Sequence, residues 1–196
     1  KSTNEGGIWY STDGKTWQAS NLANPGTNVS ISWAGVGATG NGTFAAVLAN
    51  SAYTSSGQLV FTSTNGKDWT PNSGLSGTFE VVNYANGYIY ANVRSSNTIY
   101  YSTNGINWSS FSGGNARMPS SGGAAYNPTT STYVLPGGSS SSISYVLTST
   151  NGTSFSQRTV TGSNAGTVNG VAYGNAVYVA VSQSASTGGI FYSTDA

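Results

Sequence analysis

The sequence predicts an all-β protein built from repeated four-stranded sheets. The main observation is a short box of residues, YSTDGKTW at positions 10–17, that returns in altered form four more times along the 196 residues. Short alternating or β-branched stretches, typical of strands, precede each copy. In addition, no segment carries the apolar stripe of an amphipathic helix, so we expect almost no helix.

The spacing of the copies predicts the arrangement of these sheets. Successive box serines are 52, 39, 47 and 44 residues apart. A period of about 40–50 residues with several short strands per unit is typical of β-propeller blades. We therefore expect a β-propeller of about four blades, each a four-stranded antiparallel sheet with strands A to D in chain order.

Each box predicts the hairpin between strands C and D. Strand C precedes the box, as in Thr98–Tyr100, and an aromatic residue six positions after the serine starts strand D. The Asp-Gly or Asn-Gly pair favours a tight type I′ turn. The residues assigned to this structural role are Ser11, Asp13, Gly14, Trp17, Ser63, Asn65, Gly66, Trp69, Ser102, Asn104, Gly105, Trp108, Ser149, Asn151, Gly152, Phe155, Ser193 and Asp195.

The chemistry of these residues favours structure over ligand binding. A short Asp or Asn side chain can accept hydrogen bonds from N–H groups of its own turn and close it from within. The aromatic side chain supplies apolar area that can pack between neighbouring blades. We therefore expect Trp17, Trp69 and Trp108 to lie between blades and not to form platforms for sugars.

Strands A and B form a second hairpin upstream of the box. The segments 33–49, 79–93 and 168–181 align around a Gly/Asn turn, and 124–135 is a looser version. We predict a single propeller domain over 1–196. Its parts are the C–D strands of a split blade in 1–21, complete blades in 31–75, 78–112 and 120–160, and the A–B–C strands of a split blade in 167–195.

The repeated Ser-x-Asp-Gly-x-x-Trp pattern resembles the Asp-box of the bacterial neuraminidase repeat propellers, which include sialidases and many non-enzymatic relatives. The five copies extend the resemblance over most of the chain. The fullest form of the Asp-box has one more residue before the aromatic, and three copies here carry Asn at the acidic position. In that family the box is a structural turn far from the active site, so the resemblance implies a fold and not an activity.

The two ends of the chain are near copies of each other. Residues 186–195 read STGGIFYSTD and residues 2–13 read STNEGGIWYSTD. Either the ring closes on itself, with residues 14–20 as strand D of the last blade, or the chain is one unit of a longer propeller or array. We favour the second alternative. An open strand edge is also a template for pairing, so the last blade could accept a strand from a neighbouring subunit.

Composition excludes several classes of function. Only 6% of the residues are charged, the net charge is +1, and Cys and His are absent. Disulfides, Cys/His zinc sites and His-based triads are therefore excluded, and we expect no cofactor. Nothing indicates binding to nucleic acid or insertion into a membrane. The surface, rich in Ser, Thr, Asn, Gly and Tyr, suggests an extracellular protein or one on a cell or virion surface.

Candidate catalytic groups are few. Asp13 and Asp195 belong to boxes, and Glu80 is the best candidate but lacks the second carboxylate that glycosidases use. Sialidases bind the substrate carboxylate with three arginines, and the Arg-Ile-Pro or Arg-Leu-Pro motif that supplies the first of them is absent. We therefore predict a non-enzyme. The remaining acidic residues are Glu5 and Asp68, and the arginines are Arg94, Arg117 and Arg158.

The predicted function is a non-enzymatic structural or adhesion protein that self-associates into a fibre or appendage. A carbohydrate-binding module is the alternative, because aromatic faces stack on sugars and the chain has 13 Tyr and 5 Trp. About half of the five tyrosines between positions 84 and 101 should point outward. A fragment of a sialidase-like hydrolase is the third interpretation. Candidate N-glycosylation sites are Asn28, Asn41, Asn107 and Asn151.

Overall fold

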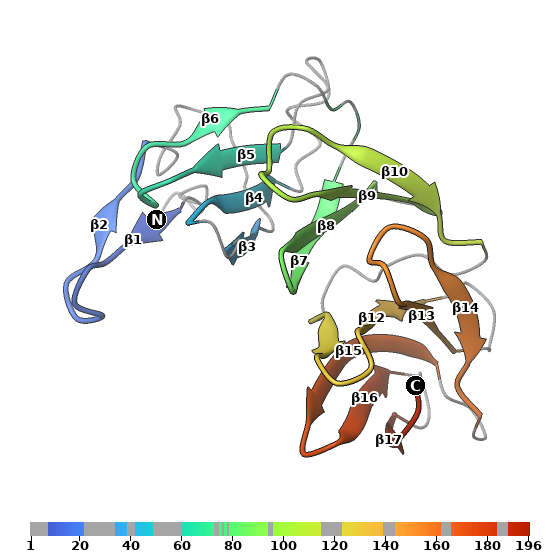
Figure 1. The fold of residues 1–196 in the computed structure, drawn as a ribbon. Coiled ribbons are helices and arrows are strands. Elements are labelled where there is room, and N and C mark those ends of the chain that lie inside the picture. The colour runs from blue at the N-terminus through green and yellow to red at the C-terminus, as the bar shows by residue number, and fades with distance from the viewer. Residues whose placement is uncertain are drawn as a thin grey trace.

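The computed structural model describes residues 8–21, 34–38, 42–48, 60–72, 75, 77, 79–93, 96–114, 123–138, 144–161, 166–183 and 188–196. These residues form strands β1 to β17 and no helix. All strand pairs are antiparallel, and the sheets follow one another along an arc (Figure 1).

The strands fall into five groups in chain order. The end hairpin contains β1 (Trp9–Tyr10) and β2 (Gln18–Ala19). The first sheet contains β3 (Ala34–Ala38), β4 (Phe44–Leu48), β5 (Val60–Ser63) and β6 (Thr70–Pro71). The second contains β7 (Phe79–Ala85), β8 (Tyr88–Val93), β9 (Thr98–Ser102) and β10 (Ser109–Ser112). The third contains β11 (Ala125–Asn127), β12 (Thr132–Gly137), β13 (Tyr145–Ser149) and β14 (Ser156–Thr159). The terminal sheet contains β15 (Thr167–Gly174), β16 (Val177–Gln183) and β17 (Gly189–Ser193).

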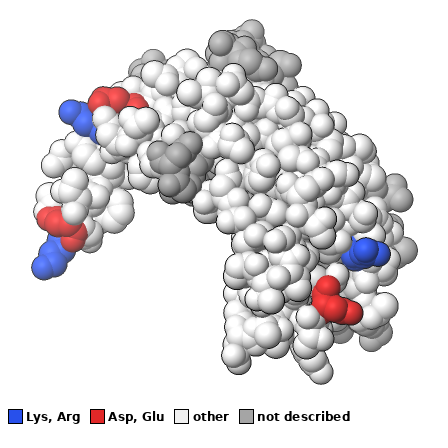
Figure 2. Space-filling model, viewed as in Figure 1, with Lys and Arg blue, Asp and Glu red and all other residues white. Residues whose placement is uncertain are grey.

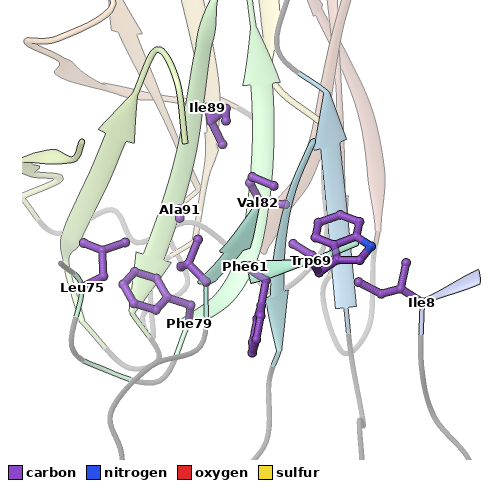
Figure 3. Close-up of a cluster of buried hydrophobic side chains, with 11 residues drawn as sticks. Ile8, Phe61, Trp69, Leu75, Phe79, Val82, Ile89 and Ala91 are labelled. Atoms are coloured by element: carbon purple, nitrogen blue, oxygen red, sulfur yellow. The ribbon is translucent and has the colours of Figure 1, made fainter. Parts of the chain in front are cut away.

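Neighbouring sheets pack face to face through three apolar clusters. The first includes Val60, Phe79 and Ile89 and joins the first and second sheets (Figure 3). The next two join the second sheet to the third and the third sheet to the terminal sheet. The prediction of an all-β propeller with about four four-stranded blades is confirmed, because three such sheets and five further strands follow this plan.

The alternating direction of side chains along the strands explains how one sheet packs against two neighbouring sheets. In the third sheet Leu135 and Leu147 lie in the cluster with the second sheet, whereas the adjacent Val134 and Val146 lie in the cluster with the terminal sheet. Successive side chains of a strand point to opposite faces, and here both faces are covered. The central strands are therefore apolar on both sides.

This double coverage corrects the prediction for the tyrosines of the second sheet. None of the five is exposed. Both faces of the sheet are covered by neighbours, so alternation sends no side chain of this group into solvent. One face carries Tyr84 and Tyr100, which pack against the first sheet, and the other carries Tyr88, Tyr90 and Tyr101, which pack against the third.

The turns differ between the two kinds of hairpin. Asn86 and Gly87 join β7 to β8 with φ values of 39° and 88°, and β15 joins β16 through two residues that also have positive φ. Positive φ at both central residues is the type I′ pattern. The box turns are longer, since residues 103–108 separate β9 from β10, and Gly105 alone has positive φ there. The type I′ prediction for the box is therefore wrong.

The two ends of the arc do not meet. Among the described strands, β2 pairs only with β1, and β17 pairs only with β16. The end hairpin and the terminal sheet lie at opposite ends of the arc, and a wide hollow separates them (Figures 1 and 2). In this structure residues 14–20 do not pair with the last sheet of the same chain, so the alternative of a ring closed in that way, which we did not favour, is not observed.

Candidate functional site

The five box turns share one hydrogen-bond scheme. Each box serine hydroxyl donates to the Asp or Asn Oδ1 two residues later, over distances of 2.7–3.1 Å. The same hydroxyl accepts from the backbone N–H three residues later, at 2.8–3.1 Å. In the first four boxes the Oδ1 also accepts from two N–H groups of the turn, at 2.7–2.9 Å. These oxygens therefore act within their own turns.

The box aromatics have different environments along the arc. The indole Nε1 of Trp69 donates to the Gly66 carbonyl at 2.9 Å, and that of Trp108 donates to Gly105 at 3.0 Å. Phe155 reaches the preceding sheet, where its ring meets Tyr90 edge-on at 5.6 Å between centroids. In these three boxes the aromatic side chain packs against neighbouring sheets, as expected.

Trp17 departs from that pattern. Its side chain is 59% exposed, against 3% for Trp69. The difference arises because the end hairpin has no described sheet on the side that a box aromatic faces. The expectation that Trp17 lies between two blades is therefore wrong for this chain by itself.

Asparagine side chains link consecutive sheets at the box turns. Asn21, which follows β2, donates from Nδ2 to the Trp69 carbonyl and accepts from the Trp69 N–H, both at 2.9 Å. Asn72, which follows β6, donates to the carbonyls of Gly105 and Ile106 at 3.0 and 2.9 Å. The end of a D strand is thus bound to the box of the next sheet.

Three aspartates are engaged in box turns. Hydrogen bonds from the Thr16 and Lys15 N–H groups and the Ser11 hydroxyl lower the pKa of Asp13 to about 2. Asp195 accepts from Ser193 at 2.7 Å. The Asp68 carboxylate accepts from Asn65 Nδ2 at 2.9 Å, and Glu80 lies in β7. The other candidates, Glu5, Arg94 and Arg117, lie outside the described residues.

Other candidate sites can be located in the same way. Asn107 and Asn151 are exposed, and Asn151 closes its turn through Oδ1, whereas Asn28 and Asn41 lie outside the described residues. Within the described ranges, no three His, Cys, Asp or Glu side chains gather where they could hold a metal ion. No helix suited to spanning a membrane occurs in the part of the chain that the structure describes.

A groove of about 730 Å³, which the sequence analysis did not predict, lies between the third and terminal sheets. The third sheet contributes Val134, Val146 and Arg158, and the terminal sheet contributes Tyr178 and Phe191. The Tyr178 side chain is 4% exposed, and its buried hydroxyl has no hydrogen-bond partner among the described residues. A buried polar group without a partner is costly, so this groove is the best candidate for an interaction site.

Large apolar side chains are exposed at both ends of the arc. On the terminal sheet the exposed fractions are 37% for Val179, 45% for Val181, 78% for Ile190 and 82% for Tyr192. On the end hairpin, Trp9 is 57% exposed. Charged groups on the face in Figure 2 are sparse and lie near the two ends. Contiguous exposed apolar surface marks interaction sites in soluble proteins.

Comparison with known proteins supports the fold. No model of a protein family matches the sequence, and no curated protein matches it. The structure resembles a solved nidogen/laminin complex with a TM-score of 0.52, 15% identity and coverage of 76% of this chain and 56% of the other. It resembles YCF48 bound to D1 peptide with a TM-score of 0.51, 18% identity and coverage of 87% and 51%.

A third solved structure, arabinanase Arb43A of Bacillus subtilis, aligns with a TM-score of 0.40, 14% identity and coverage of 81% of this chain and 70% of the enzyme. The structural neighbours are β-propeller proteins. The chain spans about half the length of the first two chains that it matches, 56% and 51%. At these identities the likeness defines the class of fold.

Proposed function

We propose that this chain is a non-enzymatic structural or adhesion module of the Asp-box type, extracellular or on the surface of a cell or particle, that joins further propeller units through its end strands. The observation that carries this proposal is the pair of exposed apolar surfaces at the two ends of the arc. Ile190 and Tyr192 at one end and Trp9 and Trp17 at the other are all more than half exposed.

The chemistry of the described residues supports a structural role. The box oxygens that would be the obvious ligands for a cation or a sugar already accept hydrogen bonds from their own turns. Sheet edges with exposed apolar side chains are templates for strand addition by another subunit. Association through these edges would bury apolar side chains that are otherwise in water.

Carbohydrate binding is the second candidate, and the groove between the third and terminal sheets favours it. Sugar sites combine aromatic faces with a few convergent polar groups. Phe191 and Tyr192 line this groove together with Arg158 and Asp195. A glycan array probed with the labelled protein tests this candidate, and loss of a positive signal in Arg158→Ala would place the ligand in the groove.

A fragment of a glycoside hydrolase is the third candidate. It requires acidic catalytic groups from outside the described residues, since Asp13 and Asp195 close their own turns. Hydrolysis of aryl glycosides by the purified chain, abolished by Glu80→Gln, would favour this candidate over the other two.

The main proposal is tested by the mass and shape of the native particle. Light scattering after size exclusion, over a hundredfold range of concentration, should give a mass at least twice the 20.0 kDa of one chain. Electron microscopy should show rings or filaments built from a repeating unit. A monomer at every concentration would overturn the proposal.

A further inference from the structure

The strands at the two ends of the chain are complementary parts of one sheet. Counted from the boxes, β15, β16 and β17 are strands A, B and C, whereas β1 and β2 are strands C and D. Residues 188–195 and 6–13 read GGIFYSTD and GGIWYSTD, so β17 and β1 differ by one aromatic substitution. Two strands with almost the same sequence can occupy the same place beside β16.

We propose that the end hairpin of a second copy replaces β17 on β16. The inference rests on the proposed self-association, and it identifies the partner as a second copy of this chain. The junction between the two copies is then a four-stranded sheet in the order β15–β16–β1–β2, with β1 and β2 from the second copy. In the observed register, Val179, Ala180 and Val181 face Tyr192, Phe191 and Ile190, respectively. After exchange they would face Tyr10, Trp9 and Ile8.

The groove is positioned to receive Trp17 of the incoming hairpin. Within the chain, a box aromatic packs toward the preceding sheet, as Phe155 does on Tyr90. The groove lies on the corresponding side of the terminal sheet, between Val146 and Phe191. An incoming strand D would therefore bring the 59% exposed Trp17 into the groove, near the buried Tyr178 hydroxyl. In the same move, Trp9 takes the place of Phe191.

The exchange also covers the outer face of the terminal sheet. Ile8 and Ile190 hold the same position before their box serines, yet Ile8 is 7% exposed and Ile190 is 78% exposed. Ile8 is buried because it packs in the cluster of the first sheet. The hairpin is tied to that sheet by the Asn21–Trp69 hydrogen bonds, so it would bring the first sheet with it. That sheet would then cover Val179.

Cysteine pairs test the exchange, because the 196 residues contain no cysteine. The double variant Tyr10→Cys/Val179→Cys brings its thiols face to face only after exchange. The matched variant Val179→Cys/Tyr192→Cys does so only if β17 keeps its observed place. Opposed residues of an antiparallel pair lie about 4.5–5.5 Å apart between Cα atoms, which suits a disulfide. On non-reducing gels we expect a covalent dimer from the first variant and little intrachain bond in the second.

The outcomes separate this inference from the proposed function. A dimer by light scattering in which only the second pair links would overturn the exchange and leave self-association standing. A monomer would overturn both. Circular dichroism identifies a variant that fails to fold.

For that case, the single substitution Trp17→Ala is the second test. It should weaken the affinity between the two copies roughly 10- to 100-fold. The exposed Ile106→Ala should leave association unchanged, and an equal effect of both would overturn the role of Trp17.

Discussion

The second and terminal sheets use the same sequence pattern in two different environments. Three residues before the box serine, the second sheet has Ile99 and the terminal sheet has Ile190. The first side chain is completely buried and the second is 78% exposed. Both residues belong to a strand C, and each precedes a copy of the box. Burial is therefore decided by the presence of a sheet on either side and not by the local sequence.

The box turn itself is the same in both environments. In the second sheet the Ser102 hydroxyl donates to Asn104 at 3.1 Å, and in the terminal sheet the Ser193 hydroxyl donates to Asp195 at 2.7 Å. These contacts span two residues and need no neighbouring sheet. The box turn is formed by local contacts, whereas the burial of core side chains depends on the neighbouring sheets. The predictions below separate these two contributions.

The largest expected difference is between Ile99→Ala and Ile190→Ala. The first opens a cavity in a filled interface and should lower the free energy of unfolding by about 2–5 kcal/mol. The second removes a side chain that is already in solvent and should change it by less than about 0.5 kcal/mol in the monomer. Urea denaturation of both variants, at a concentration where the chain is monomeric, measures the difference. Equal losses would mean that a sheet covers β17 under those conditions.

The box glycines give the next contrast, Gly152→Ala against Gly14→Ala. Both glycines have positive φ, 74° and 70°, so alanine costs about 1–2 kcal/mol in either turn. A Cβ on Gly152 would also lie 2.8 Å from Tyr88 Cε2, whereas one on Gly14 meets no described atom within 4 Å. Crowding in a packed region should add about 1–3 kcal/mol at Gly152.

Thermal denaturation of the two glycine variants gives this difference directly. The Gly14 variant reports the strain of the turn alone and serves as the control for the Gly152 variant. If both variants lose the same stability, the Tyr88 ring moves aside at little cost and the interface between the second and third sheets is softer than its packing suggests.

A smaller contrast is expected for two tyrosine hydroxyls. The Tyr90 hydroxyl donates to the Gly152 carbonyl at 2.9 Å inside the stack, whereas the Tyr10 hydroxyl donates to Gln18 at 2.7 Å in solvent. Burial, together with the neighbouring Tyr133, raises the pKa of Tyr90 far above its ordinary value, so the donor keeps its proton. Tyr90→Phe should cost about 1 kcal/mol and Tyr10→Phe close to nothing. Chemical denaturation at neutral pH tests the pair, and an equal cost would mean that water reaches Tyr90.

These contrasts explain which features the sequence could predict. The repeat period, the C strands and the box residues depend on local spacing and turn chemistry, so the all-β propeller class followed from the sequence. The burial of Trp69 also followed, because a box aromatic normally has a preceding sheet to pack on. The length of the box turn did not follow, since it depends on hydrogen bonds that two successive N–H groups donate to Oδ1.

The features that the sequence could not predict depend on neighbours. The exposure of Trp17 and Ile190 results from their place at the ends of the arc, which no local pattern encodes. The groove is formed by two sheets that are separate in the sequence, and the unpartnered Tyr178 hydroxyl appears only when they pack.

The smallest effect concerns one box turn alone, where Asp13 can be compared with Asn65, Asn104 and Asn151. Asp13 has a folded-state pKa of about 2, below the ordinary value of 3.8. A lowered pKa means that the ionised form stabilises the turn above about pH 4, and that this contribution is lost as the pH falls toward 2. Asn accepts the same two N–H bonds in the other boxes. Asp13→Asn should therefore keep the turn and remove its dependence on pH.

In NMR titrations, the amide shifts of the two following turn residues should change with a midpoint near 2 in the natural chain and stay flat in the variant. A midpoint near 3.8 in the natural chain would mean that these hydrogen bonds do not persist in solution, and the view of the box as a self-sufficient turn would have to be abandoned for the end hairpin.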